Sequence, residues 1–271
     1  MLMPSASKPS HERLTRGADE TGATCAGLAL GYSDMMRPEL KQAMTRAWQA
    51  LGACGVWWTA DERLTIAREA RAARDCPLCQ ARKVAPIPQA VAGSHIVATT
   101  LSAAAIEAIH RIVSDPGRLS SAWYARTTAM GLSDEAYVEL PGVVAMTTAI
   151  DTFDRARGSP QRVLPPAGAG QPGRRRPVGA RPGLGWMPML APEDVTADDP
   201  PLYACAGRIG GNIHRALSLV PEAMMQFWDL FEEMYLPQDA MRDFGREYRA
   251  VTHAQIEMLA ARVAVRNQCV Y

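Results

Sequence analysis

Apolar residues recur at intervals of three and four positions through most of this chain, and this period constrains its fold more than any other feature. The spacing predicts amphipathic helices, each of which must bury one face. Alternation of apolar and polar residues, which would predict strands, is not convincing in any segment. We therefore expect an all-α fold. The predicted helices cover residues 33–51, 59–74, 102–113, 120–156, 212–235 and 252–267.

A stretch dense in proline, glycine and arginine interrupts the helical pattern from Gly158 to about Pro201. These residues cannot sustain a helix, so we interpret the stretch as a long connector. Its basic run GRRRPVGAR has no interleaved aromatic residues, which favours a solvated linker over a basic contact site. The chain then divides into a disordered or extended N-terminal segment (1–36), a larger helical part (37–158), the linker (159–204) and a shorter helical part (205–271).

The composition argues against two classes of partner. With Lys+Arg 29 against Asp+Glu 28, the chain has no charge excess that would favour nucleic acid or an anionic membrane. No run of about 18 apolar residues indicates a transmembrane helix, and the first residues lack the apolar stretch of a signal peptide. We therefore expect a cytoplasmic protein that binds neither nucleic acid nor membranes. In the cytoplasm a Cys-x-x-Cys pair is more often catalytic or metal-binding than a structural disulfide.

Such a pair occurs in the sequence CPLC, at Cys76 and Cys79. Pro77 suits the first turn of a helix, which would make Cys76 the N-cap residue. The unpaired backbone N–H groups and the helix dipole at that end favour the thiolate over the thiol. Cys79, one turn later, could then resolve a sulfenic acid or a mixed disulfide formed at Cys76. CPLC is therefore a candidate redox site.

The helix before CPLC and the last helix of the chain share a plan. A capping box opens each of them, Thr-x-x-Glu at residues 59–62 and Thr-x-x-Gln at residues 252–255. A cysteine follows each threonine at the same distance, because 76 − 59 and 269 − 252 are both 17. In the second unit, Glu257 lies 269 − 257 = 12 positions before Cys269.

The spacing from Glu257 to Cys269, in a helix that opens on a threonine cap, resembles the core of the alkylhydroperoxidase and carboxymuconolactone decarboxylase-like (AhpD-like) family. Residues 111–158 also resemble the longer, two-part peroxidase-related members. That family is all-helical, and its redox members carry Glu, eleven residues, Cys-x-x-Cys, three residues and His. The resemblance implies an AhpD-like helical bundle with two related halves, in which Glu257 is the relay carboxylate and Cys269 the first redox cysteine.

The second cysteine and the histidine of that pattern would fall at positions 269 + 3 = 272 and 269 + 7 = 276, past Tyr271. Some members of the family have selenocysteine, encoded by UGA, at the second cysteine position. We therefore state the hypothesis that the chain is a selenoprotein whose C-terminal half is truncated at residue 272. A cloned fragment, a frameshift and a true stop codon are the alternatives.

CPLC departs from the family pattern, because the ungapped alignment puts Leu64 at the carboxylate position and Lys83 at the histidine position. Two interpretations stay open. CPLC is an auxiliary or degenerate dithiol, or Glu62 replaces the carboxylate from two positions away. Glu139 and Asp151 have the same separation as Glu257 and Cys269, because 151 − 139 = 12. This second copy of the pattern has no thiols, and we expect it to be structural.

The leading hypothesis is a thiol- or selenol-dependent peroxidase, which reduces a hydroperoxide and is recycled by a thiol reductant or a reductase protein. Its candidate catalytic residues are Cys269, Glu257, Cys76, Cys79 and Glu62. No cofactor is expected, because the sequence has no Gly-rich phosphate loop. The alternatives are a non-redox carboxymuconolactone decarboxylase-like enzyme, which would use the helical cavity for proton transfer, and a catalytically inactive helical scaffold. We also expect a homo-oligomer.

A zinc site at Cys76 and Cys79 ranks below these hypotheses. Structural zinc needs four ligands, and the sequence offers one Cys-x-x-Cys with no His-x-x-x-His partner, so no metal is expected. We expect His95, His110 and His214 to be ordinary hydrogen-bonded or exposed histidines. Three further cysteines have no partner at motif spacing and are expected to be buried or inert: Cys25, Cys54 and Cys205.

Overall fold

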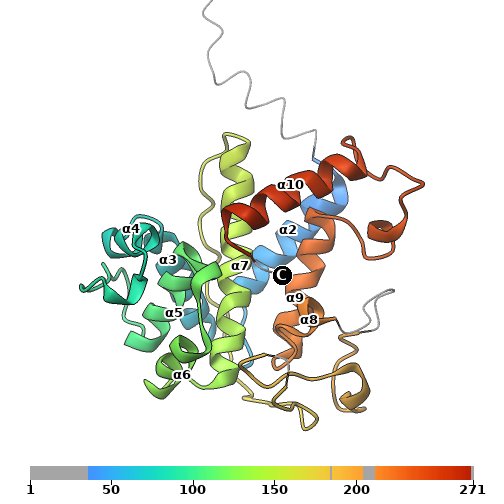
Figure 1. Ribbon diagram of the computed structural model, residues 1–271. Helices are drawn as coiled ribbons and strands as arrows, with labels where there is room; N and C mark the ends of the chain where they lie inside the picture. The colour runs from blue at the N-terminus through green and yellow to red at the C-terminus, as the bar shows by residue number, and fades with distance from the viewer. Residues whose placement is uncertain (1–35, 184, 204–210, 270–271) are drawn as a thin grey trace, which may run out of the picture. The chain divides into compact units, whose positions relative to one another are not determined.

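A computed structural model describes residues 36–183, 185–203 and 211–269 of the chain. This part of the protein contains nine α-helices and no β-strand, so the predicted all-α class is confirmed. The helices, labelled in Figure 1 where there is room, are α2 (Pro38–Leu51), α3 (Ala60–Ala73), α4 (Pro77–Val84), α5 (Ala103–Ser114), α6 (Ser121–Ala129), α7 (Asp134–Ala156), α8 (Asn212–Arg215), α9 (Pro221–Met234) and α10 (His253–Arg266).

Local sequence signals determine where several helices begin. Both predicted capping boxes form, at the starts of α3 and α10. In each, the threonine side chain accepts from the backbone of the third helical residue, whose own side chain accepts from the threonine N–H. α4 begins at Pro77, and Cys76 is its N-cap residue as predicted.

Two predicted segments are each divided into two helices. Residues 120–156 form α6 and α7, which a turn at Gly131 separates; its φ of 99° is a backbone conformation that favours glycine. Residues 212–235 form α8 and α9, and α9 begins at Pro221. A proline disfavours helical geometry in the residue before it, which explains why the first helix does not continue into the second.

α7 lies at the centre of the helical core. It packs against α3 and α5, and against α2 and α9, which lie on its other side in Figure 1. Leu140 and Ile150 of α7 are fully buried in the main apolar cluster, and Leu219 and Leu230 from beyond the connector belong to the same cluster. Full burial of each such side chain contributes about 1.5–3 kcal/mol. Helices on both sides of the connector therefore share one core.

Two buried ion pairs join α3 to α7. Arg63 Nη1 lies 3.2 Å from Glu139 Oε1, and both side chains are almost fully buried. Arg71 donates two hydrogen bonds, of 2.9 and 2.8 Å, to the carboxylate of Asp151. Removing one partner of a buried pair leaves an uncompensated charge, which costs about 3–5 kcal/mol. Glu139 and Asp151 therefore have a structural role in holding the two helices together.

The connector contacts the helical core at several points. The Trp48 indole donates to the backbone carbonyl of Val163. A Cβ at Gly52 would lie 2.5 Å from a carbonyl oxygen of the connector, so this close approach requires glycine. Within the basic run, Arg176 makes an ion pair with the buried carboxylate of Glu135. The composition favours a solvated linker, but the structure shows a connector that packs on the helices. Its contacts are with residues distant in sequence, through backbone carbonyls and the Glu135 carboxylate.

α10 contributes little to the core. His253 is the one buried residue of this helix, while Met258, Leu259 and Val263 are 58%, 55% and 59% exposed. These exposed apolar side chains do not amount to a membrane span, since none of the described helices is both long and apolar enough to cross a bilayer.

Candidate metal centre

Four side chains from separate parts of the chain meet beside α4. Cys76 and Cys79 belong to CPLC, His110 belongs to α5, and His95 lies in the extended loop between the 3-10 helix η2 (Pro88–Ala90) and α5. One potential ligand atom from each residue lies within 4.8 Å of the other three. We call these four residues the Cys2His2 cluster.

The start of α4 positions both cysteines. Cys76 is the N-cap residue, and its backbone carbonyl accepts the first helical hydrogen bond from Gln80 at 3.0 Å. Cys79 lies three residues later, about one helical turn away, so the two side chains share one side of the helix end. Both residues are only 1% exposed, and they do not form a disulfide with each other.

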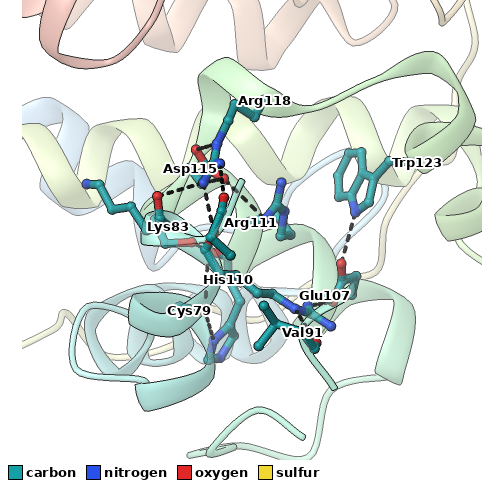
Figure 2. A network of polar contacts seen from close by, with 12 residues as sticks. Cys79, Lys83, Val91, Glu107, His110, Arg111, Asp115, Arg118 and Trp123 are labelled. Atoms are coloured by element: carbon teal, nitrogen blue, oxygen red, sulfur yellow. Dashed lines mark hydrogen bonds and ion pairs between the residues drawn. The ribbon is translucent and has the colours of Figure 1, made fainter. Parts of the chain in front are cut away.

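Three sulfur–nitrogen distances within the cluster are close to those of a tetrahedral metal site. Cys79 Sγ lies 3.2 Å from Nδ1 of His110, a contact drawn in Figure 2, and 3.5 Å from Nδ1 of His95. Cys76 Sγ lies 3.7 Å from the same nitrogen of His95. Zinc bonds of about 2.3 Å to sulfur and about 2.0 Å to nitrogen give S···N edges of about 3.5 Å in a tetrahedron. The three measured separations are close to that value.

A carboxylate lies behind each imidazole. His110 Nε2 is 2.8 Å from Glu69 Oε1, and His95 Nε2 is 2.8 Å from Glu107 Oε2. If each carboxylate accepts the Nε2 proton, the Nδ1 lone pair faces the sulfur atoms. Histidines that bind metals in proteins usually have this arrangement, in which the carboxylate fixes the tautomer and the orientation of the ring.

Glu69 also anchors the loop that carries His95. It lies on α3, is fully buried, and accepts hydrogen bonds from the Ala98 backbone at 3.1 Å and from the Thr99 hydroxyl at 2.6 Å, in addition to His110. Three donors compensate for the burial of its charge. One carboxylate therefore joins α3, α5 and the loop around the cluster.

A glycine sets the path of the same loop. Gly93 has a φ of 143°, a conformation that residues with side chains rarely adopt. A Cβ at this position would lie 3.1 Å from a methyl group of Leu78, the residue between proline and the second cysteine of CPLC. The loop therefore packs directly on the CPLC turn, and His95 follows two residues later.

Arg118 holds the other end of α4, as Figure 2 shows. Its guanidinium donates to the carbonyl oxygens of Arg82, Lys83 and Ala85, at the end of the helix where the regular hydrogen bonds between residues four positions apart stop. Asp115 fixes the guanidinium through contacts of 2.9 and 2.8 Å. Lys83, which the sequence alignment puts at the family's histidine position, is exposed at this end of the helix.

Hydrogen bonds make both thiols more acidic than burial alone would allow. Burial raises the pKa of the Cys79 thiol, but its hydrogen bonds with His110 and His95 outweigh burial and lower the pKa to about 6. Burial also raises the pKa of the Cys76 thiol, and hydrogen bonds with the Cys79 backbone and with His95 bring it below its ordinary value. The cluster therefore favours thiolates.

The imidazoles are perturbed in the opposite sense. Burial lowers the pKa of His95, but hydrogen bonds with Cys79 and Glu107 outweigh burial and raise the pKa to about 10. For His110, burial again lowers the pKa, and hydrogen bonds with Cys79 and Glu69 give a net increase. Sulfur and nitrogen atoms thus hold protons strongly between them, and a divalent cation could take the place of those protons.

This arrangement can support two kinds of chemistry. Two thiolates and two neutral imidazoles form a donor set that zinc favours. Alternatively, a thiolate that a neighbouring imidazole stabilises is a nucleophile, and a second cysteine one turn away can resolve its oxidation product.

The structure brings together only two of the five candidate catalytic residues, Cys76 and Cys79. Glu62 is exposed at the opposite end of α3, where its carboxylate accepts from the backbone N–H and hydroxyl of Thr59. The 14-residue helix separates it from CPLC by about 20 Å. The structure therefore does not bring Glu62 to CPLC. Glu69, two turns further along α3, is the carboxylate that contacts the cluster, through His110.

The other two candidates lie apart from the cluster, on α10 and just after it. Glu257 is exposed and accepts a hydrogen bond of 2.6 Å from the Tyr235 hydroxyl. Cys269 is exposed beyond the last turn, and its backbone N–H donates to the Ala264 carbonyl. The stretch from Glu257 to Arg266 spans about 13 Å of helix, so a direct relay between this carboxylate and Cys269 is not formed.

Sequence reasoning missed both histidines and both carboxylates of this centre. His95 and His110 lie 16 and 31 residues after Cys79, which is no recognised motif spacing. The sequence offered one indication, the place of two of these polar residues on the buried face of a predicted helix. Glu69 and His110 fall among buried apolar residues of amphipathic helices, where a polar side chain needs a partner.

The remaining sequence expectations concern isolated residues. His214 is an ordinary hydrogen-bonded histidine, since its Nε2 lies 3.0 Å from Gln238 Oε1. Cys54 is half-buried. Cys25 and Cys205 lie outside the described residues.

Comparison with known proteins identifies no relative. No protein-family model, no curated protein and no solved structure matches the chain. The likeness to the AhpD-like family therefore rests on residue spacing alone, and function has to be argued from the cluster.

Proposed function

We propose that this protein binds one zinc ion through Cys76, Cys79, His95 and His110. The observation that carries the proposal is the convergence of two sulfur and two imidazole nitrogen atoms within 4.8 Å of one another. Four protein ligands of this kind are typical of structural zinc. The shortage of ligands that argued against zinc in the sequence does not apply, because the two histidines come from separate elements.

Charge balance supports a divalent ion at this position. Two thiolates and one Zn²⁺ sum to zero, and neutral imidazoles leave that sum unchanged, so the metal core can be buried without a net charge. The outer carboxylates are compensated separately. Glu107 lies 3.2 Å from the guanidinium of Arg82, and Glu69 accepts from three donors.

The packing around α4 indicates what the ion would do. Within the part of the chain that the structure describes, the buried apolar cluster at this corner contains only Leu78 besides the two cysteines, with the partly buried Val91 packed against it. That cluster is separate from the main core and is too small to fix an eight-residue helix and a loop of extended chain. Zinc would cross-link α4, the His95 loop and α5 where apolar packing is sparse, and would therefore act as a structural clamp.

Metal content tests the proposal directly. Elemental analysis of protein purified without chelators should find about one zinc per chain, and cobalt substitution should give the visible bands of thiolate-bound tetrahedral Co²⁺. Cys79→Ser and His110→Ala should reduce both signals, whereas Cys54→Ser, which removes a thiol outside the cluster, should leave them unchanged. Protein without bound metal that also fails to bind cobalt would refute the proposal.

A second candidate function is the dithiol peroxidase or oxidoreductase, and the lowered pKa of Cys79 favours it. A thiolate would attack the outer oxygen of a hydroperoxide, forming a sulfenic acid and releasing an alcohol once the leaving oxygen takes a proton. The other cysteine would displace water to form a disulfide, which an external dithiol or reductase protein would reduce. His110, backed by Glu69, would be the base in this scheme.

The two candidates give different results in one experiment. Protein freed of metal should consume hydroperoxide in the presence of a dithiol if the redox function is correct, and zinc should inhibit that turnover. Cys79→Ser should abolish it and Cys269→Ser should not. Stoichiometric zinc without any peroxide turnover by the metal-free protein would leave the structural clamp as the function of the cluster.

A further inference from the structure

A pocket of about 630 Å³ opens beside the Cys2His2 cluster, and the zinc proposal gives it no role. Its walls come from α4, the segment from η2 to α5, α5 itself and α6, and two of its lining residues, His95 and Glu107, belong to the cluster and its outer shell. This volume lies within the range of small-molecule sites, about 300–1,000 Å³. Much of the lining is apolar: Val97, Leu101, Ile106, Trp123 and Met130.

The charged side chains of the pocket are mostly cationic. Arg82, Arg111 and Arg126 line it, with Glu107 as the acidic residue among the lining. The Glu107 carboxylate is already engaged by His95 at 2.8 Å, by the Arg82 guanidinium at 3.2 Å and by the Trp123 indole at 2.9 Å. It therefore compensates Arg82. Arg111 shares the single carboxylate of Asp115 with Arg118, and Arg126 is exposed, so positive charge exceeds negative charge around the pocket.

Arg111 is the residue that points to a ligand. It is only 2% exposed, yet neither Nη atom has a hydrogen-bond acceptor among the described residues. Among the described residues its ion-pair partner is Asp115, 3.3 Å from Nη1, and Arg118 already holds that carboxylate at 2.9 and 2.8 Å; Glu107 also attracts the charge of Arg111. Figure 2 shows both arginines around the one aspartate. A buried guanidinium with unsatisfied donors is costly unless an acceptor enters the site.

We propose that this pocket binds a small monocarboxylic acid with an apolar body, whose carboxylate accepts hydrogen bonds from the two Nη atoms of Arg111. The planar guanidinium matches a carboxylate in a bidentate pair. Arg126 is exposed and lines the same pocket, so it adds attraction on the solvent side. The apolar body would lie against Ile106 and Trp123, away from water.

The lining also distinguishes a carboxylate from inorganic phosphate. A phosphate dianion needs several donors around three or four oxygen atoms, and it gains nothing from apolar walls. Here one buried guanidinium faces a mostly apolar space, which suits a single negative charge at one end of a hydrophobic molecule. This inference concerns the pocket and does not depend on a metal in the cluster.

Calorimetric titration of the full chain with 4-phenylbutyrate, octanoate and indole-3-acetate tests the proposal. At least one acid should bind in the micromolar to low millimolar range, while its neutral amide and inorganic phosphate should bind much more weakly. Equal binding of acid and amide would overturn the role of the charge. Binding of phosphate as tight as that of the acids would overturn the apolar acid as ligand, and failure of all three acids to bind would overturn the site.

Variants connect binding to the named residues. Arg111→Met keeps much of the side-chain volume, leaves Asp115 paired with Arg118, and should weaken binding of the acid at least about tenfold. Arg126→Met changes an exposed side chain and should weaken binding by about two- to fivefold, so the proposal stays testable if Arg111→Met fails to fold. Arg68→Met, at an exposed position of α3 outside the pocket, is the matched control and should bind like the wild type. Unchanged binding in both pocket variants would refute the assignment.

Discussion

Replacing Glu69 by glutamine is the sharpest test of the metal centre, because it changes neither a ligand nor the size of the side chain. The wild-type carboxylate accepts from His110 Nε2 at 2.8 Å, from the Thr99 hydroxyl at 2.6 Å and from the Ala98 backbone at 3.1 Å. A glutamine amide presents one oxygen and one NH2 group to these three donors. At least one donor would then face another donor inside a fully buried site.

Two effects of Glu69→Gln can be sized from these contacts. Loss of the outer carboxylate of a metal-bound histidine typically costs about 10- to 100-fold in metal affinity. Loss of a charge-assisted hydrogen bond together with an unsatisfied donor costs about 2–4 kcal/mol of folding free energy. We therefore expect weaker zinc binding, measured by competition with a chromogenic chelator, and a lower free energy of unfolding, measured in urea.

Glu62→Gln is the matched control, since it makes the same chemical change on the same helix, at an exposed capping position. Glutamine also serves in a capping box, so stability should fall by less than about 1 kcal/mol and zinc affinity should stay unchanged. If Glu69→Gln binds zinc as tightly as wild type does, His110 is not held for a metal and the centre is wrongly assigned.

Three further outcomes are expected. Chelation of the metal should lower the melting temperature of the wild type but not of Cys79→Ser, as differential scanning calorimetry would show; equal shifts in both would count against a structural ion. In the metal-free protein, ultraviolet absorbance of the Cys79 thiolate should appear above a midpoint near pH 6 and vanish below it. Hydrogen bonds with His110 and His95 lower the pKa of this thiol. A midpoint near pH 9, or the same curve in Cys79→Ser, would contradict that cause. Gly93→Ala should destabilise the fold by about 1–3 kcal/mol in urea, because φ at this position is 143°, and a neutral effect would mean that the loop relaxes freely.

The helical class and several helix starts followed from the sequence because they depend on residues close together in the chain. Helical periodicity and the capping boxes at residues 59–62 and 252–255 are local features, and they formed as predicted. The same holds for Cys76 at the N-cap before Pro77. The sequence did not predict that residues 120–156 divide into two helices. The apolar periodicity continues across Gly131, although the backbone turns at that residue.

The candidate site could be predicted only in part, since its members come from four elements. CPLC is local and was found, whereas His95 and His110 reach it through the packing of a loop and a helix. Nothing in a single sequence fixes the packing of α5 on α4. The family spacing falls on Leu64, and Glu62, two positions away, was the alternative carboxylate. The buried Glu69, two turns further along the same helix, is the carboxylate that contacts His110 of the cluster.

Zinc binding and dithiol chemistry need the same two cysteines and depend on the same neighbouring imidazoles. One cluster therefore cannot do both at the same time. Hydrogen bonds from the two imidazoles lower the pKa of Cys79, and hydrogen bonds with Cys79 and Glu107 raise that of His95. The site therefore stabilises positive charge between sulfur and nitrogen, whether as protons or as a metal ion. A thiolate bound to zinc has its lone pair engaged, and a disulfide between the cysteines removes two ligands. If the metal content of the protein is unknown, a measured rate of peroxide turnover would depend on the fraction of clusters that hold zinc. It would not report the reactivity of the cysteines themselves. Metal content has to be determined before any activity is assigned to CPLC.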